Sequence, residues 1–180
     1  MIIFINGAFG VGKSNTAELL AARLPHSLIF DAEMVGYFLR RVIPASAQPD
    51  DFQNLPMWRT LTIATAHQLR QNYGWTLVMP MTIWHRPYFD EILGGLRAAG
   101  ETIHHFCLTA TMETLEARIR ASNEAVEWRL AHAERCIATF QTPAFATQVP
   151  TDGKTPEEVV EEILAQLPHG RMESGASLPV

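Results

Sequence analysis

The chain has 180 residues, 47% hydrophobic and 18% charged, a composition typical of one soluble globular domain with a core large enough to fold alone. Fourteen basic residues against 19 acidic ones give a formal net charge of −5, and the absence of a basic stripe argues against nucleic acid as a partner. Cys107 and Cys136 lack metal-ligand spacing, and no segment is typical of a secretory leader or a membrane span, so we expect a cytoplasmic protein with free thiols.

Short apolar runs alternate with longer helical patterns along the chain. The runs are mostly apolar without strict alternation, which suits a parallel sheet covered on both faces. The expected strands are residues 2–6, 28–31, 75–81, 103–109 and 145–150. The expected helices are residues 13–24, 32–43, 57–73, 86–99, 111–121, 124–141 and 155–167. This order predicts a doubly wound α/β fold.

The last helix has the clearest boundary signals. Thr155 can cap it, Pro156 suits its first turn, and Glu158 completes a capping box. Residues 44–56 contain three prolines and predict an irregular surface loop. Residues 168–180 have no periodicity and predict a flexible tail after a single domain that spans residues 1–167.

Residues 7–14, GAFGVGKS, match the Walker A pattern G-x-x-x-x-G-K-[ST] and stand between an expected strand and an expected helix. The N–H groups of such a loop cradle phosphates, its lysine reaches the outer phosphates, and its serine hydroxyl can ligate Mg²⁺. A plain glycine turn is the competing interpretation, and a P-loop alone does not distinguish switches, motors and kinases. The expected ATP-binding residues are Gly7, Ala8, Gly10, Val11, Gly12, Lys13, Ser14 and Asn15, with Arg118 from a later helix.

Two acids follow the second expected strand, at the sheet edge where open α/β sheets bind ligands. Asp31 is the candidate to activate an attacking hydroxyl or to hold Mg²⁺ together with Ser14. Glu33 is a candidate substrate contact, although an acid there can equally complement the helix dipole. The third strand, in VMPMTI, ends without the acid by which an ATPase machine holds Mg²⁺, which argues against a motor.

Polar residues also follow the third strand. Thr82 and His85 are candidate substrate contacts, although His85 can equally be a loop residue without a role. His104 and His105 lie in a strand without an acid or cysteine at useful spacing, so we expect them to be structural rather than metal ligands.

Arginines surround an expected helix break at Ser122–Asn123. Arg118, Arg120 and Arg129 predict a lid over residues 118–130 that brings cations to the phosphates, with Arg118 and Arg129 as the catalytic candidates. Solvated helix faces are the competing interpretation, because most arginines are exposed.

Four segments, INGAFGVGK, DDFQNLPMWR, VMPMTI and HHF, resemble in order and spacing the bacterial tunicamycin-resistance protein family, whose relatives include small-molecule kinases such as chloramphenicol phosphotransferase. The resemblance covers roughly residues 1–167. It implies a nucleoside-monophosphate-kinase-like fold with five parallel strands, ATP binding from Gly7 to Ser14, and resistance to a uridine-containing antibiotic. It further implies that Asp31 is the base and that TDGKTPEE flanks adenine.

Some members of that family attach to membranes through a C-terminal amphipathic helix. The residues after Leu167 in this chain do not match such a helix, so we expect no stable membrane attachment.

The residues and the resemblance together predict an ATP- and Mg²⁺-dependent phosphotransferase that acts on a hydroxyl of a nucleoside-like antibiotic. Trp58 and Arg59 are expected to contact the acceptor, although Trp58 can equally belong to the core. Two alternatives remain open: an ATP-dependent protein that sequesters tunicamycin without phosphoryl transfer, and a kinase for a housekeeping metabolite. The missing acid after the third strand favours sequestration, and Asp31 beside a complete P-loop favours transfer. The oligomeric state is not indicated.

Overall fold

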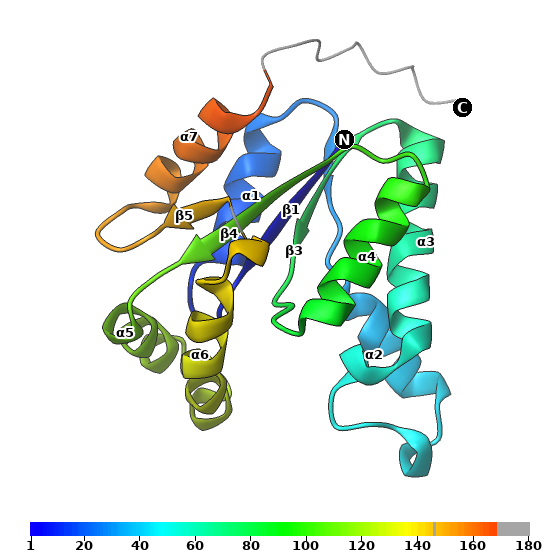
Figure 1. The fold of residues 1–180 in the computed structure, drawn as a ribbon, viewed down its shortest axis with the longest axis horizontal. Helices are drawn as coiled ribbons and strands as arrows, with labels where there is room; N and C mark the ends of the chain where they lie inside the picture. Colours follow the sequence, from blue (N-terminus) through cyan, green and yellow to red (C-terminus); the bar gives the residue numbers. More distant parts are fainter. Residues whose placement is uncertain (146, 169–180) are drawn as a thin grey trace.

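The structure, a computed structural model, describes residues 1–145 and 147–168, so most of the tail expected at 168–180 lies outside the described residues. Its centre is a five-stranded parallel sheet in the order β2-β3-β1-β4-β5 (Figure 1). The strands are β1 (Ile2–Gly7), β2 (Ser27–Ile29), β3 (Thr76–Pro80), β4 (Ile103–Thr109) and β5 (Gln148–Pro150). The expected five-stranded α/β fold is therefore confirmed.

Seven helices connect and cover the strands in the described residues, each ending within two residues of the bounds expected from the sequence. On one side of the sheet α1 packs against α7, and on the other α3 packs against α4 (Figure 1). The helices are α1 (Lys13–Arg23), α2 (Glu33–Val42), α3 (Pro56–Tyr73), α4 (Arg86–Ala98), α5 (Met112–Ser122), α6 (Val126–Phe140) and α7 (Pro156–Gln166).

The central strand β1 is buried along its whole length, as expected for a strand with a neighbour on each side and helices on both faces. Cys107 and Cys136 are buried with free thiols, and burial raises the pKa of Cys107 to about 12 and that of Cys136 to about 11. Within residues 1–145 and 147–168, no helix has the length and apolar character that crossing a membrane requires.

The capping box predicted for α7 is present. Thr155 Oγ1 accepts a hydrogen bond from the Glu158 N–H at 3.3 Å, and Glu158 Oε2 accepts one from the Thr155 N–H at 2.7 Å. Such caps typically stabilise a helix by about 1 kcal/mol.

The loop between α2 and α3 has more regular structure than expected. It contains two short 3-10 turns, Ala45–Ala47 and Phe52–Asn54. The Phe52 ring is half-buried, and a Cβ added to Gly36 of α2 would meet that ring at 2.6 Å. Since Phe52 also packs against Trp58 at a centroid distance of 5.4 Å, the loop folds back onto α2 and α3.

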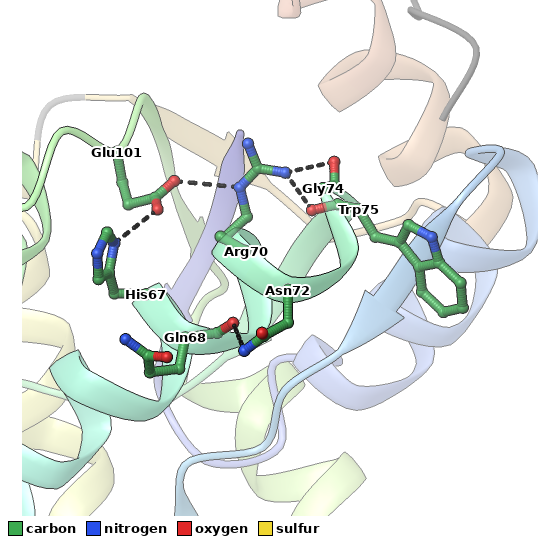
Figure 2. Close-up of polar contacts among 7 residues, drawn as sticks. All are labelled: His67, Gln68, Arg70, Asn72, Gly74, Trp75 and Glu101. Carbon is green, nitrogen blue, oxygen red and sulfur yellow. Dashed lines mark hydrogen bonds and ion pairs between the residues drawn. The ribbon is translucent and has the colours of Figure 1, made fainter. Parts of the chain in front are cut away.

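A polar cluster fastens the amino-terminal edge of the sheet (Figure 2). Glu101 lies two residues before β4, and its Oε2 accepts a hydrogen bond from Arg70 Nε at 3.1 Å, while its Oε1 lies 3.0 Å from His67 Nδ1. Arg70 also donates through Nη1 to the Gly74 carbonyl at 2.7 Å. The cluster joins the end of α3 to the start of β4. It therefore lies at the amino-terminal ends of the strands, whereas the P-loop follows the carboxyl end of β1.

Candidate nucleotide and acceptor site

The P-loop follows β1 and leads directly into α1. Gly12 is the residue before α1 and has φ +104°, a left-handed conformation that favours glycine. It offers no side-chain cap, so the first N–H groups of α1 remain available for an anion. At Gly7 a Cβ would lie 2.7 Å from the Leu108 carbonyl oxygen of β4, so only glycine fits that close approach. The sequence pattern has thus produced a loop whose backbone is arranged to bind phosphate.

Lys13 is folded back onto this loop. Its Nζ donates hydrogen bonds to the carbonyls of Gly7 at 3.0 Å and Ala8 at 2.8 Å. Burial lowers the pKa of Lys13 to about 8, while nearby groups that include Glu33 oppose the change. The two carbonyl partners of the Lys13 ammonium group are neutral. A phosphate in the loop would give it an anionic partner in their place.

The P-loop forms the floor of a cleft of about 1220 Å³, which extends from α2 to the segment between α5 and α6. Several candidate residues chosen from the sequence line it together although they lie far apart in the chain. They are Gly10, Val11, Gly12, Lys13, Ser14, Asn15, Asp31, Glu33, Thr82, Arg118 and Arg129.

Asp31 and Glu33 lie together at the α2 side of the cleft. Asp31 Oδ1 accepts a hydrogen bond from the Glu33 N–H at 2.9 Å. Burial and, secondarily, the Asp31 carboxylate raise the pKa of Glu33, whose Oε2 accepts a hydrogen bond from Tyr37 Oη at 3.2 Å. The arrangement keeps two carboxylates facing the same cleft as Lys13.

The oxygen donors near the P-loop suit Mg²⁺. Ser14 is exposed and Asp31 half-buried, and both line the cleft. Within the described residues no group of three or more His, Cys, Asp or Glu side chains could hold a metal. Magnesium usually binds through one or two protein oxygens together with water and substrate phosphates, so Ser14 and Asp31 are a fitting donor set for a nucleotide-bound ion.

Arg118 joins three elements at the other side of the P-loop. Its Nη1 donates to the Val11 carbonyl at 3.2 Å and to Thr151 Oγ1 at 3.0 Å, and its Nη2 donates to the Thr151 carbonyl at 3.0 Å. Through these bonds α5 holds the P-loop against the segment between β5 and α7, the segment in which TDGKTPEE occurs.

The helix break expected at Ser122–Asn123 is present. Asn123 and Ala125 have φ values of +53° and +44°, and α6 begins at Val126. Arg129 donates to Ser122 Oγ at 3.3 Å and pairs with Glu124 at 2.8 Å, so it is held across the break and faces the cleft.

The third arginine of this segment differs from the other two. Arg120 pairs with Glu116 at 2.8 Å on an exposed face of α5 and is outside the cleft lining.

The structure corrects the expected acceptor role of Trp58. This side chain is fully buried, and its Nε1 donates to the Ala32 carbonyl at 3.0 Å, so the core interpretation holds. Arg59 is also outside the cleft lining: it pairs with Glu91 at 2.5 Å and donates to the Gln53 carbonyl at 2.7 Å. His85 precedes α4, packs on Tyr88 at 4.2 Å and is likewise outside the lining.

Sequence reasoning missed the aromatic part of the cleft. Its lining includes Phe9 inside the P-loop motif and Trp128 inside the segment EWRL, both adjacent to residues singled out for their charge. Other aromatic side chains in the lining are Tyr37, Phe52, Trp84 and His132. Phe9, an aromatic residue within a phosphate-binding motif, was the feature of the sequence that could have indicated this aromatic part of the cleft.

Residues 2–143 match the family described as AAA domain. The chain belongs to that family. No curated protein sequence matches it. Among solved structures, this AAA domain is similar to the tunicamycin resistance protein of Deinococcus radiodurans, with 29% identity, a TM-score of 0.79, and coverage of 92% of this chain and 94% of that one. The resemblance noted from the four sequence segments is thereby confirmed.

Two further structures show the same fold at lower identity. A sugar kinase from Janibacter sp. HTCC2649 has a TM-score of 0.63 and 18% identity, covering 91% of this chain and 92% of that one. A gluconokinase from Sinorhizobium meliloti 1021 has a TM-score of 0.60 and 17% identity, covering 91% and 89%. This AAA domain therefore has a kinase-like fold.

Proposed function

We propose that the protein is an ATP- and Mg²⁺-dependent phosphotransferase whose acceptor is a hydroxyl of a nucleoside-like antibiotic, with tunicamycin as the first candidate. The observation that supports the proposal is that Lys13 and Asp31, the candidate phosphate-binding cation and the candidate proton acceptor, line the same cleft. The similarity to a tunicamycin resistance protein supports the choice of acceptor. The cytoplasm, where ATP is available, is the proposed compartment.

Three polar residues of the cleft, Lys13, Ser14 and Asp31, bind the nucleotide and its metal ion in this proposal. Lys13 exchanges its bonds with the Gly7 and Ala8 carbonyls for bonds to the outer phosphates of ATP. Ser14 and Asp31 would hold Mg²⁺, which supplies positive charge to the phosphate oxygens when bound.

The chemical step is the attack of an acceptor hydroxyl on the γ-phosphorus. A new acceptor O–P bond forms, the bond from the γ-phosphorus to the bridging oxygen of ATP breaks, and ADP leaves with the electron pair of that bond. Asp31 takes the hydroxyl proton, while Arg118 and Arg129 lie beside the P-loop to offset negative charge on the phosphates.

Sequestration without transfer is the second candidate, and one observation favours it. The tip of β3 presents Pro80, Met81 and Thr82 to the cleft in place of an acid, and Thr82 uses its Oγ1 to donate to the Gly7 carbonyl at 3.0 Å. A metal-holding acid would then come from another part of the cleft lining, where Asp31 is the candidate proposed above. A housekeeping sugar kinase is a weaker alternative, because the resemblance to sugar kinases concerns the fold alone.

Mass spectrometry of tunicamycin after incubation with the protein, ATP and Mg²⁺ tests the proposal. Transfer predicts a product heavier by one phosphoryl group and an equal amount of ADP, and it predicts that Lys13→Ala forms neither. Tunicamycin that binds the ATP-loaded protein but is recovered unchanged would support sequestration. Phosphorylation of gluconate in place of tunicamycin would support the housekeeping alternative.

A further inference from the structure

Three aromatic rings connect the P-loop to α6 above Lys13. The Phe9 and Trp128 centroids lie 5.0 Å apart with an interplanar angle of 69°, and Trp128 stacks on His132 at 4.3 Å and 30°. Lys13 Nζ lies 5.7 Å from the Phe9 centroid, and all three rings line the cleft. We call Phe9, Trp128 and His132 the aromatic clamp.

The clamp is not explained by core packing. Trp128 leaves 52% of its surface exposed, although an aromatic side chain of this size usually buries most of its area, and His132 is half-buried. His132 Nδ1 lies 2.7 Å from the Trp128 carbonyl oxygen, which fixes the imidazole under the indole. The indole is therefore held in place while much of it remains open to the cleft.

Phosphate binding does not explain the clamp either. The P-loop binds phosphate through backbone N–H groups and Lys13, so the ring of Phe9 adds nothing to that function. The ring does place apolar surface close to Lys13, where the outer phosphates of a nucleotide would lie. A ligand group on the clamp would consequently lie next to the phosphoryl group that is transferred.

The adenine of ATP has a separate candidate location. Arg118 fastens the P-loop to Thr151, and Lys154 and Pro156 continue the cleft lining there. The opposite part of the cleft contains the carboxylates of Asp31 and Glu33. An acceptor between these regions would meet carboxylates suited to hydroxyl groups and aromatic faces suited to a flat ring.

We propose that the aromatic clamp binds a flat heterocyclic ring of the acceptor, which stacks on Trp128. The clamp thereby selects nucleoside-like acceptors over sugars that carry no flat aromatic or heterocyclic group. This inference rests on the proposed function for the acceptor but concerns binding and not transfer. Stacking of a base on an aromatic side chain typically strengthens binding by about 10- to 100-fold.

Calorimetry on the full chain with Mg²⁺ and a non-hydrolysable ATP analogue tests the clamp with two matched pairs of probes. Uridine is compared with ribose, and p-nitrophenyl β-glucoside with methyl β-glucoside. We expect at least one ring-bearing probe to bind about 10-fold or more tightly than its partner. In Trp128→Ala this preference should be lost, while the affinity for the ATP analogue stays within about twofold.

Two further variants separate stacking from structural damage. Trp128→Phe keeps an aromatic face and should retain most of the ring preference. Tyr73→Ala removes an exposed aromatic side chain at the far end of α3 and should leave all affinities unchanged.

Two results would overturn the clamp directly: no ring preference in the wild type, or an unchanged preference in Trp128→Ala. A third would be a loss of affinity for the ATP analogue in Trp128→Ala as large as the loss for the ring-bearing probe, which would assign Trp128 to the nucleotide. Tunicamycin left unphosphorylated while the Trp128-dependent preference persists would contradict the proposed function but not the clamp.

Discussion

Asp31 Oδ1 accepts a hydrogen bond from the backbone N–H of Glu33 at 2.9 Å. The carboxylate of Asp31, proposed as proton acceptor, is therefore oriented by the backbone of the first residue of α2 and not by the side chain of that residue. An asparagine can keep that contact, because its Oδ1 is also an acceptor.

For this reason Asp31→Asn should separate chemistry from structure. We expect an unchanged melting temperature and ATP affinity within a few-fold of the wild type, with single-turnover phosphoryl transfer slowed by about 10²- to 10⁴-fold. Rapid-quench measurement of the labelled phosphoryl group tests this. A folded variant that transfers at the wild-type rate would remove Asp31 from the chemistry.

Nucleotide binding should depend on pH through Lys13. The pKa of Lys13 is lowered to about 8 in the ligand-free protein, and a bound triphosphate favours the charged ammonium and raises this pKa again. Between these two pKa values binding takes up a proton, so ATP affinity should fall as pH rises above about 8, by at most about tenfold per pH unit.

Calorimetry in two buffers of different ionisation enthalpy measures that proton directly. At pH 9 it should show proton uptake on ATP binding, and at pH 7 the uptake should be much smaller. Equal heats in both buffers at pH 9 would show that Lys13 is already fully charged in the ligand-free protein.

Arg118→Ala should weaken ATP binding, because the guanidinium fastens the P-loop carbonyl of Val11 to Thr151. Hydrogen bonds from charged groups contribute about 1.5 to 3 kcal/mol, so we expect a loss of about 10- to 100-fold in affinity. Arg120→Ala is the matched control on the same helix, since an exposed pair such as Arg120–Glu116 contributes little. Equal effects of the two substitutions on ATP affinity would argue against a specific role for Arg118.

Stability, in contrast, should depend on Glu101, which is distant from the cleft. Its side chain is 5% exposed and faces Arg70 and His67 (Figure 2). Glu101→Ala leaves Arg70 without its carboxylate, and we expect a loss of about 2 to 4 kcal/mol in unfolding free energy with ATP affinity retained. Urea denaturation tests this, and a change below about 0.5 kcal/mol would mean that solvent replaces the pair.

The parts of the fold that local patterns determine were predictable. The P-loop, the break at Asn123 and the capping box of Thr155 each depend on residue types within a few positions of one another, and each is present. The apolar runs also predicted the strands, although β2 and β5 are shorter than expected because each lies at an edge of the sheet with a single neighbour.

The composition of the cleft was harder to predict because it depends on contacts between distant segments. Nothing near Trp58 indicates that its indole turns toward Ala32 in the core and not toward the cleft. The contact between Phe9 and Trp128 joins residues in separate elements, and the charges of Lys13 and Arg129 beside them were the stronger local signals.

Phosphorus-31 nuclear magnetic resonance of the protein with ATP, Mg²⁺ and tunicamycin tests the central claim most directly, because it follows the γ-phosphoryl group to its final bond. The proposed function predicts that the γ signal of ATP is replaced by a phosphomonoester signal that co-purifies with tunicamycin, in a one-to-one ratio with ADP. An unchanged ATP spectrum at saturating tunicamycin, or inorganic phosphate as the sole product beside ADP, would contradict it.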